Sequence, residues 1–262
     1  MTRRPPALLL AAGLFTVVPV HMYELDRDAA RRAILALPWL GLVLGALAGL
    51  VAAGVVALGD GALLAAATAL AVLALVTGAM HLDGLADTAD GLGSRKPPGQ
   101  AVGIMKKSDV GPMGVATLVL VVLLEVGALA SPRISAYGWW ALTAAVAGAA
   151  MTGRLLALSA TTAASPAAHG SGFAQLFSGV TSRRSLVLST AAVGLVDGGL
   201  GFGASGLRGL LVFVGAGIVA WCVGWFWRRR VIRRLGGVNG DVWGSLIELG
   251  QLAFVFVVAL AL

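Results

Sequence analysis

The stretch ALLAAATALAVLALVTGAMHLDGLADTADGLG, residues 62–93, decides the fold, because an apolar run and an acidic run meet inside it. Residues 62–80 contain no charged side chain, whereas Asp83, Asp87 and Asp90 follow directly after them. About twenty apolar residues in a helix match the ~30 Å hydrocarbon thickness of a bilayer. The sequence therefore predicts a membrane span that ends where a polar stretch, residues 81–111, begins.

The apolar pattern of this stretch recurs along the whole chain. Hydrophobic residues make up 58% of the sequence and charged residues 12%, too few to cover a soluble core. We predict an all-α polytopic membrane protein that forms one integral membrane domain over residues 1–262. About seven spans are expected, at 38–58, 62–80, 112–130, 137–158, 186–203, 207–227 and 243–262. Gly41, Gly45 and Gly49, spaced by four, predict a helix-packing stripe of the kind found in lipid.

The segment 1–37 is expected to lie at the membrane interface. Arg3 and Arg4 precede an apolar run that is short for a span and is broken by Pro19, which predicts a retained helix that enters the membrane only partly. Residues 21–37 are rich in charge and predict a separate short amphipathic helix at the surface.

The basic residues indicate the orientation. With a cytoplasmic N-terminus, the predicted spans place all 19 Lys and Arg residues on the cytoplasmic side except Arg133 and Arg208. This predicts a multi-pass protein of the cytoplasmic membrane, with its active site among the cytoplasmic loops 81–111, 159–185 and 228–242. The net charge of +7 then reflects topology and anionic lipid, and nothing in the sequence suggests a nucleic-acid partner.

The acidic cluster is the first candidate site. Asp83, Asp87 and Asp90 are spaced i, i+4 and i+7, which places them on one face of a helix. Such carboxylates repel one another unless a cation lies among them, and an all-oxygen set favours Mg²⁺ or Mn²⁺. The alternative is a solvated helix end. His81 is expected to orient an aspartate or contact substrate, or else to serve only as a polar anchor.

Basic residues near this cluster suggest phosphate binding. Lys106, Lys107 and Ser108 lie in the same predicted loop, and cations beside a bound metal are the usual equipment for holding phosphates. Arg154, at the predicted cytoplasmic end of its span, is expected to reach either a phosphate or a lipid headgroup.

The last loop and span, RRLGGVNGDVWGSLIELG at 233–250, hold the other candidates. Glycines around Asn239 and Asp241 let a ligand approach the backbone, and Asn239 is a predicted substrate ligand. Glu248 lies about two helical turns after Asp241, so both can face one cavity and are predicted catalytic residues. The alternative for Glu248 is a carboxylate that snorkels or pairs with a nearby arginine. Glu125 is expected outside the site, in the outer half of its span.

Four motifs together resemble the cobalamin synthase family, the adenosylcobinamide-GDP ribazoletransferases. They are FTVVPV at 15–20, LPWLGLVLG at 37–45, HLDGLADTADG at 81–91 and LGGVNGDVWGSLIELG at 235–250. They occur in family order over nearly the whole chain, and the last two are the most specific.

The resemblance implies a magnesium-dependent enzyme of the membrane that completes the nucleotide loop of vitamin B12. Its substrates would be a corrinoid nucleotide, adenosylcobinamide-GDP, and α-ribazole or its 5′-phosphate, with GMP released. On this hypothesis, a ribose hydroxyl attacks the β-phosphorus near a metal held by Asp83, Asp87 and Asp90, and basic side chains stabilise the departing GMP. The general base stays open among Asp83, Asp241 and Glu248. A homo-oligomer is compatible with the sequence, which leaves the number of copies open.

The chain departs from the family pattern at two places. Family members usually read M-K-D-S-R-x-G where residues 105–111 read MKKSDVG, so that Lys107 and Asp109 exchange the acid and the base across Ser108. The loop at 165–173 lacks the arginine of a P-x-A-R-x-x-G-x-G-like stretch, and His169 or Arg154 is expected to take over its phosphate, or activity is reduced.

Two other functions stay open at this point. Residues 87–95 half-match the D-x2-D-G-x2-A-R motif of the CDP-alcohol phosphotransferases, but the two later aspartates of that family are absent. An ion-coupled transporter would instead use the intramembrane acids Glu125, Asp197 and Glu248.

Overall fold

The computed structural model describes residues 5–21, 25–59, 61–168 and 170–262. In these residues the chain is built from helices, with one isolated backbone bridge between Ala167 and Val238. The helices are α1 (Ala7–Phe15), α2 (Arg27–Ala57), α3 (Ala62–Thr77), α4 (Met80–Gly93), α5 (Pro98–Met105), α6 (Pro112–Leu129), α7 (Pro132–Ser135), α8 (Gly138–Ser159), α9 (Gly172–Phe177), α10 (Arg183–Leu235) and α11 (Gly240–Ala261).

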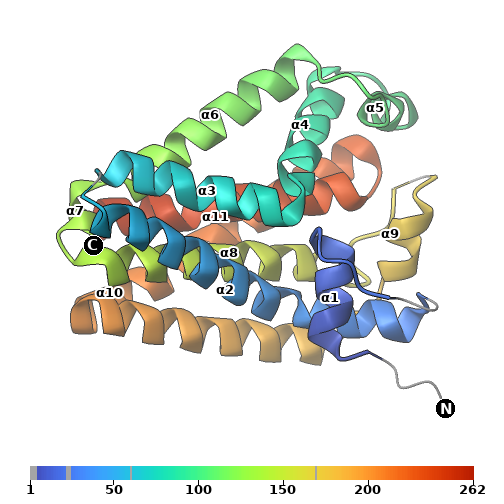
Figure 1. Ribbon diagram of the computed structural model, residues 1–262. Helices are drawn as coiled ribbons and strands as arrows, with labels where there is room; N and C mark the ends of the chain where they lie inside the picture. The colour runs from blue at the N-terminus through green and yellow to red at the C-terminus, as the bar shows by residue number, and fades with distance from the viewer. Residues whose placement is uncertain (1–4, 22–24, 60, 169) are drawn as a thin grey trace.

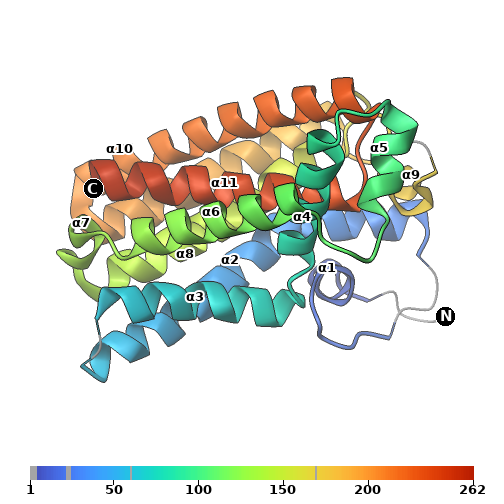
Figure 2. The same ribbon diagram turned by 90° about the horizontal axis from the view of Figure 1, so that it is seen from above.

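Helix α8 is the centre of the bundle. All of its residues from Ala141 to Ser159 are buried, and α2, α10 and α11 pack around it (Figures 1 and 2). The outer helices expose large apolar side chains instead, among them Leu75 of α3, Leu123 of α6 and Leu195 of α10. A helix that is buried all round within helices that expose leucine is the pattern of an all-α polytopic membrane protein.

The predicted glycine stripe of α2 is confirmed. A Cβ added at Gly45 would lie 2.7 Å from the Cα of Ala147, and one at Gly49 would lie 2.6 Å from the Cα of Thr143. Gly41 is equally close to the α8 backbone. Three small residues on one face therefore let α2 and α8 approach closely.

The number of spans stays a prediction. In the described residues, five helices are long and apolar enough to cross a membrane, and the bent pair α3–α4 makes a sixth if it counts as one span. Helix α10 is counted once here, although its 53 residues exceed any single crossing. It breaks at Ser205 and Gly206, and its two arms pack where Gly201 meets Gly209, as the predicted spans 186–203 and 207–227 require.

Two predicted segments differ in the structure. The separate helix expected over 21–37 is wrong, because α2 begins at Arg27 and runs without a break through Pro38; packing against neighbouring helices offsets the lost hydrogen bond. The predicted span 62–80 ends early, because Gly78 and Ala79 adopt left-handed conformations and turn the chain by 90° into α4. Arg3, Arg4 and Glu24 lie outside the described residues.

The two ends of the bundle differ in character. At the end that holds the C-terminus, Arg133 donates to the carbonyl of Leu260, and Arg208 donates to that of Ala261 at 3.0 and 3.2 Å. These arginines satisfy carbonyls at the end of α11 that have no helical partner. The opposite end carries α1, α4, α5, α9 and the start of α11 (Figure 1). The segments with the candidate site residues therefore gather at one end.

Candidate active site

A close crossing of α4 and α11 assembles the site. A Cβ added at Gly84 would lie 2.7 Å from the carbonyl oxygen of Asp241, and one at Gly244 would lie 2.9 Å from that of His81. Only glycine leaves room for backbones at this separation. The crossing therefore places the acidic face of α4 beside Asp241, which is more than 150 residues away in the sequence.

The resulting acidic cluster consists of Asp83, Asp87 and Asp241. Asp83 is exposed, and the other two are partly buried. Burial, and next the negative charge of Asp83, raises the pKa of Asp87 to about 7. Asp241 and then Asp90 add to this effect. Carboxylates crowded by like charges repel one another less when a cation lies among them, so the charges of this cluster favour a cation.

Asp90 has a different role in the structure. Its Oδ2 accepts the backbone amide of Gly111 at 2.7 Å, and its Oδ1 accepts that of Gly114 at 2.8 Å. Both oxygens thus satisfy amides at the start of α6, as a helix cap does. As the side chains stand, no three His, Cys, Asp or Glu residues in the described ranges converge closely enough to hold a metal. The predicted Asp83–Asp87–Asp90 site stays a prediction, and its geometry favours Asp90 least.

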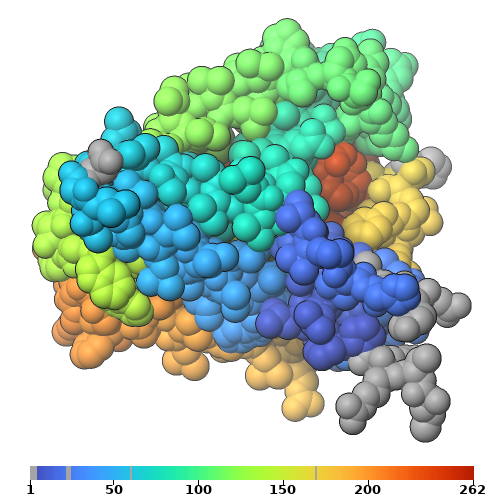
Figure 3. Space-filling model, in the orientation of Figure 1, coloured from blue at the N-terminus to red at the C-terminus, as the bar shows by residue number. Residues whose placement is uncertain are grey.

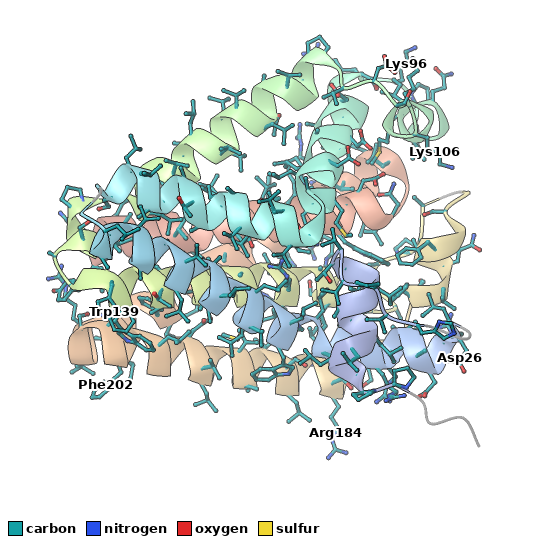
Figure 4. The ribbon with its side chains drawn as sticks, viewed as in Figure 1. Asp26, Lys96, Lys106, Trp139, Arg184 and Phe202 are labelled. Atoms are coloured by element: carbon teal, nitrogen blue, oxygen red, sulfur yellow. The ribbon has the colours of Figure 1, made fainter. Side chains whose placement is uncertain are left out.

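Lys106 joins the acidic cluster from α5. Its Nζ donates to the carbonyl of Gly170 at 3.1 Å, and its charge acts on Asp241. Lys107 and Ser108 follow in the same exposed turn. Figure 3 shows a hollow in the surface between α5 and α9, and the start of α11, in red, forms the floor of this hollow. Figure 4 shows Lys106 on the α5 side. Of the predicted phosphate-binding residues of this loop, Lys106 thus lies near an acid of the cluster, Asp241.

Asn239 holds Asp241 in place. Its Oδ1 accepts the amide of Val242 at 3.0 Å as the N-cap of α11, and its Nδ2 donates to Oδ2 of Asp241 at 2.7 Å. The loop before it is tied down by a pair of 2.8 Å backbone hydrogen bonds that join Val238 to Pro166 and Ala168. Asn239 is buried, so its hydrogen bonds give it a positioning role.

A second polar group lies inside the bundle. His81, Glu125, Arg154, Glu248 and Gln251 line a cavity of about 30 Å³, roughly the space of one or two water molecules. In this cavity the Nε2 of His81, an oxygen of Glu125 and the Nε of Arg154 are buried without a hydrogen-bond partner. The structure therefore separates Glu248 from Asp241, although both were expected to face one cavity.

Two expectations about this cavity are corrected. Arg154 was expected at the membrane surface, but it is 1% exposed and its Nη1 donates to Oε1 of Gln251 at 3.1 Å. Glu125 was expected outside the site, yet it shares the cavity with Glu248. Gln251 was missed. Two sequence features could have indicated these residues. Glu125 is an acid inside a predicted span, and Gln251 is a polar residue one helical turn after Glu248.

Comparison with known proteins identifies the family. A family model described as cobalamin-5-phosphate synthase matches residues 7–259. The chain belongs to this family. It is similar to the adenosylcobinamide-GDP ribazoletransferase of Frankia casuarinae, with 40% identity over 96% of this chain and 94% of the relative. Relatives of the same name from Brevibacillus brevis (33% identity, 96% of each chain) and Stutzerimonas stutzeri (35%, 97% of each) are also similar. No solved structure matches.

Membership in the cobalamin-5-phosphate synthase family argues against the two rival functions, the CDP-alcohol phosphotransferase and the ion-coupled transporter. The match spans the chain, whereas the CDP-alcohol motif was a half-match confined to residues 87–95. The three acids considered for a transporter line different cavities. Asp197 accepts a hydrogen bond from Thr152 at 2.8 Å and lines a mostly apolar cavity, whereas Glu125 and Glu248 line another.

The two departures from the family pattern fall near the site. Lys107 and Asp109 are both exposed in the turn before α6. His169 lies outside the described residues. Arg154 lies in the interior cavity, and its proposed substitution for the missing arginine stays a prediction.

Proposed function

We propose that this chain transfers the cobinamide-phosphate part of adenosylcobinamide-GDP to α-ribazole or α-ribazole 5′-phosphate and releases GMP. The observation that carries the proposal is the family match over residues 7–259, and the relatives named above are adenosylcobinamide-GDP ribazoletransferases. The cluster of acids with Lys106 at one end of the bundle suits a reaction on a pyrophosphate, where charge neutralisation and positioning supply most of the catalysis.

In the proposed reaction, a ribose hydroxyl oxygen bonds to the phosphorus that carries cobinamide. The bond from that phosphorus to the bridging oxygen breaks, and GMP leaves. Asp241, held by Asn239, would accept the proton of the attacking hydroxyl, since Glu248 lies in the interior cavity. Lys106 would bind the negative charge of the departing GMP.

We also propose that Asp83 and Asp87 hold Mg²⁺, with Mn²⁺ as a substitute. Two neighbouring carboxylates, one of them with a raised pKa, provide the hard oxygen ligands that these cations prefer. When bound, the cation would neutralise the pyrophosphate charge. Asp241 lies near enough to influence Asp87, so its charge would favour the same cation.

The proposed location is the bacterial inner membrane, with the N-terminus and the active site on the cytoplasmic side. The distribution of Lys and Arg supports it: Arg133 and Arg208 lie at the C-terminal end of the bundle, and the predicted topology puts the other basic residues on the opposite side. The lipid bilayer and the two substrates are the proposed partners, and a homo-oligomer stays a prediction.

The test is turnover by the full-length protein in liposomes. Adenosylcobinamide-GDP and α-ribazole 5′-phosphate are supplied with and without Mg²⁺, and GMP release is followed for the wild type and for Asp87→Asn. Asp28→Asn, in the first turn of α2, serves as a matched change of charge away from the cluster. We expect Mg²⁺-dependent release that Asp87→Asn loses and Asp28→Asn retains. Absence of GMP release by the wild type would contradict the proposed function.

A further inference from the structure

The ring of Phe173 is a partly exposed aromatic surface at the end of the bundle that carries the acidic cluster. Phe173 lies on α9 and is 44% exposed. Its ring centroid is 6.0 Å from that of Trp243, which follows Asp241 by two residues on α11. Lys106 donates to Gly170, three residues before Phe173. The Lys106 ammonium group therefore reaches the segment that leads directly into α9, the helix that carries Phe173.

The surroundings hold this ring in place. Phe177 is fully buried, and its ring contacts those of Phe173 and Trp243 at centroid distances of 4.9 and 5.2 Å. Arg27 of α2 fixes the end of α9 by donating to the carbonyls of Gln175 at 3.3 Å and Ser178 at 2.8 Å. Phe173 is thus supported from within by two aromatic rings and open on its other side.

Contact with lipid explains the exposure of Phe202 more simply than it explains the exposure of Phe173. Phe202, 58% exposed on the apolar first arm of α10, lies at the other end of the bundle (Figure 4). Phe173 instead follows a polar loop, and the neighbouring side chain that reaches this loop is a lysine.

We propose that Phe173 is the stacking surface for a planar aromatic base of a nucleotide substrate whose phosphate lies near Lys106. A nucleotide needs a cation for its phosphate and a flat apolar surface for its base, and every base presents a face that stacks on an aromatic ring. This inference rests on the proposed function, in which both substrates carry such a base: guanine in adenosylcobinamide-GDP, and the base of α-ribazole.

The test uses steady-state kinetics of the full-length protein in liposomes, with each substrate varied while the other is saturating. Phe173→Leu removes the aromatic face, Phe173→Tyr retains it, and Phe202→Leu is the matched control at the other end of the bundle. We expect Phe173→Leu to raise the KM of one substrate on the order of tenfold, with kcat within about twofold of the wild type. Phe173→Tyr and Phe202→Leu should keep the wild-type KM.

The two sources of the base give different results. A higher KM for adenosylcobinamide-GDP alone assigns guanine to Phe173, and a higher KM for the ribazole substrate alone assigns the base of α-ribazole. The proposal is overturned if Phe173→Leu leaves both KM values within about twofold of the wild type, or if Phe173→Tyr is as impaired as Phe173→Leu.

A second measurement separates stacking from folding and from turnover. Phe173 packs on Trp243, so the second variant, Phe173→Met, fills similar space without a ring. Its binding of labelled GMP and of labelled α-ribazole is measured by equilibrium dialysis and compared with that of the wild type. Weaker binding of one of them than by the wild type supports stacking, and equal binding of both overturns it. This result is independent of GMP release, so a wild type that binds but does not turn over would contradict the proposed function and not the stacking.

Discussion

The carboxylate of Asp90 accepts the backbone amide of Gly111 at 2.7 Å and thereby joins α4 to the start of α6. Its other oxygen accepts the amide of Gly114, which is buried. An aspartate that looks like a metal ligand from its spacing is therefore fully engaged in holding two helices together. Because of these bonds, we expect Asp90 to hold the two helices together, whereas Asp83 and Asp87 are the proposed metal ligands.

Replacement of Asp90 should reduce stability more than metal affinity. Asp90→Ala leaves two amides at the start of α6 without an acceptor, which costs about 1–3 kcal/mol of unfolding free energy. Thermal unfolding in detergent and the Mg²⁺ concentration for half-maximal GMP release are measured beside those of Asp87→Asn. If Asp90→Ala raised the Mg²⁺ requirement as strongly as Asp87→Asn at an unchanged unfolding temperature, Asp90 would be a metal ligand.

A methyl group at Gly84 should separate the two halves of the acidic cluster. In Gly84→Ala the new Cβ meets the backbone of Asp241, which cannot give way as a flexible side chain would. We expect a loss of about 1–3 kcal/mol in stability and a large drop in GMP release. Gly127→Ala in α6 is the matched control, since nothing lies within 4 Å of a Cβ at that position. Equal activity of the two variants would show that the crossing does not position the acids.

The Mg²⁺ requirement should depend on pH. The pKa of Asp87 is raised to about 7, so a proton occupies this carboxylate below pH 7 and competes with the cation, while above pH 7 the carboxylate is charged. The Mg²⁺ concentration for half-maximal activity should rise about tenfold from pH 8 to pH 6. A Mg²⁺ titration of GMP release at each pH measures it. A requirement that stays constant over this range would show that Asp87 does not bind the metal.

Arg154 should prove structural and not a phosphate ligand. Arg154→Met leaves Glu248 and Gln251 without the guanidinium in a buried cavity, which costs about 3–5 kcal/mol. Arg154→Lys retains the charge and should lose less. Unfolding temperatures of both variants are compared with their KM values. If an Arg154 variant were as stable as the wild type but had a raised KM, Arg154 would be a phosphate ligand.

Restoring the family pattern around Ser108 should favour activity. Lys107 and Asp109 are exposed, so the double change Lys107→Asp and Asp109→Arg should alter stability by less than about 0.5 kcal/mol. GMP release should equal or exceed that of the wild type, because the acid and the base then occupy their usual positions. Slower release by the double variant would mean that this chain uses Lys107 itself.

Several features could be predicted from the sequence because they depend on local composition. Apolar runs of bilayer length indicate membrane helices wherever they occur, and glycines spaced by four face one partner, as Gly41, Gly45 and Gly49 do against α8. The family motifs, which are contiguous stretches, were also readable from the chain alone. Spacing on one helix correctly placed Asp83 close to Asp87, since the two are one turn apart.

Other features were decided only by the tertiary structure, because they depend on which helices touch. Asp241 joins Asp83 and Asp87 only through the crossing at Gly84 and Gly244, and Glu125 shares a cavity with Glu248 only because α6 and α11 pack together. The continuity of α2 through Pro38 likewise depends on its neighbours. Sequence spacing determines the face of a helix on which a residue lies, whereas the partner of that face is set by packing between segments far apart in the chain.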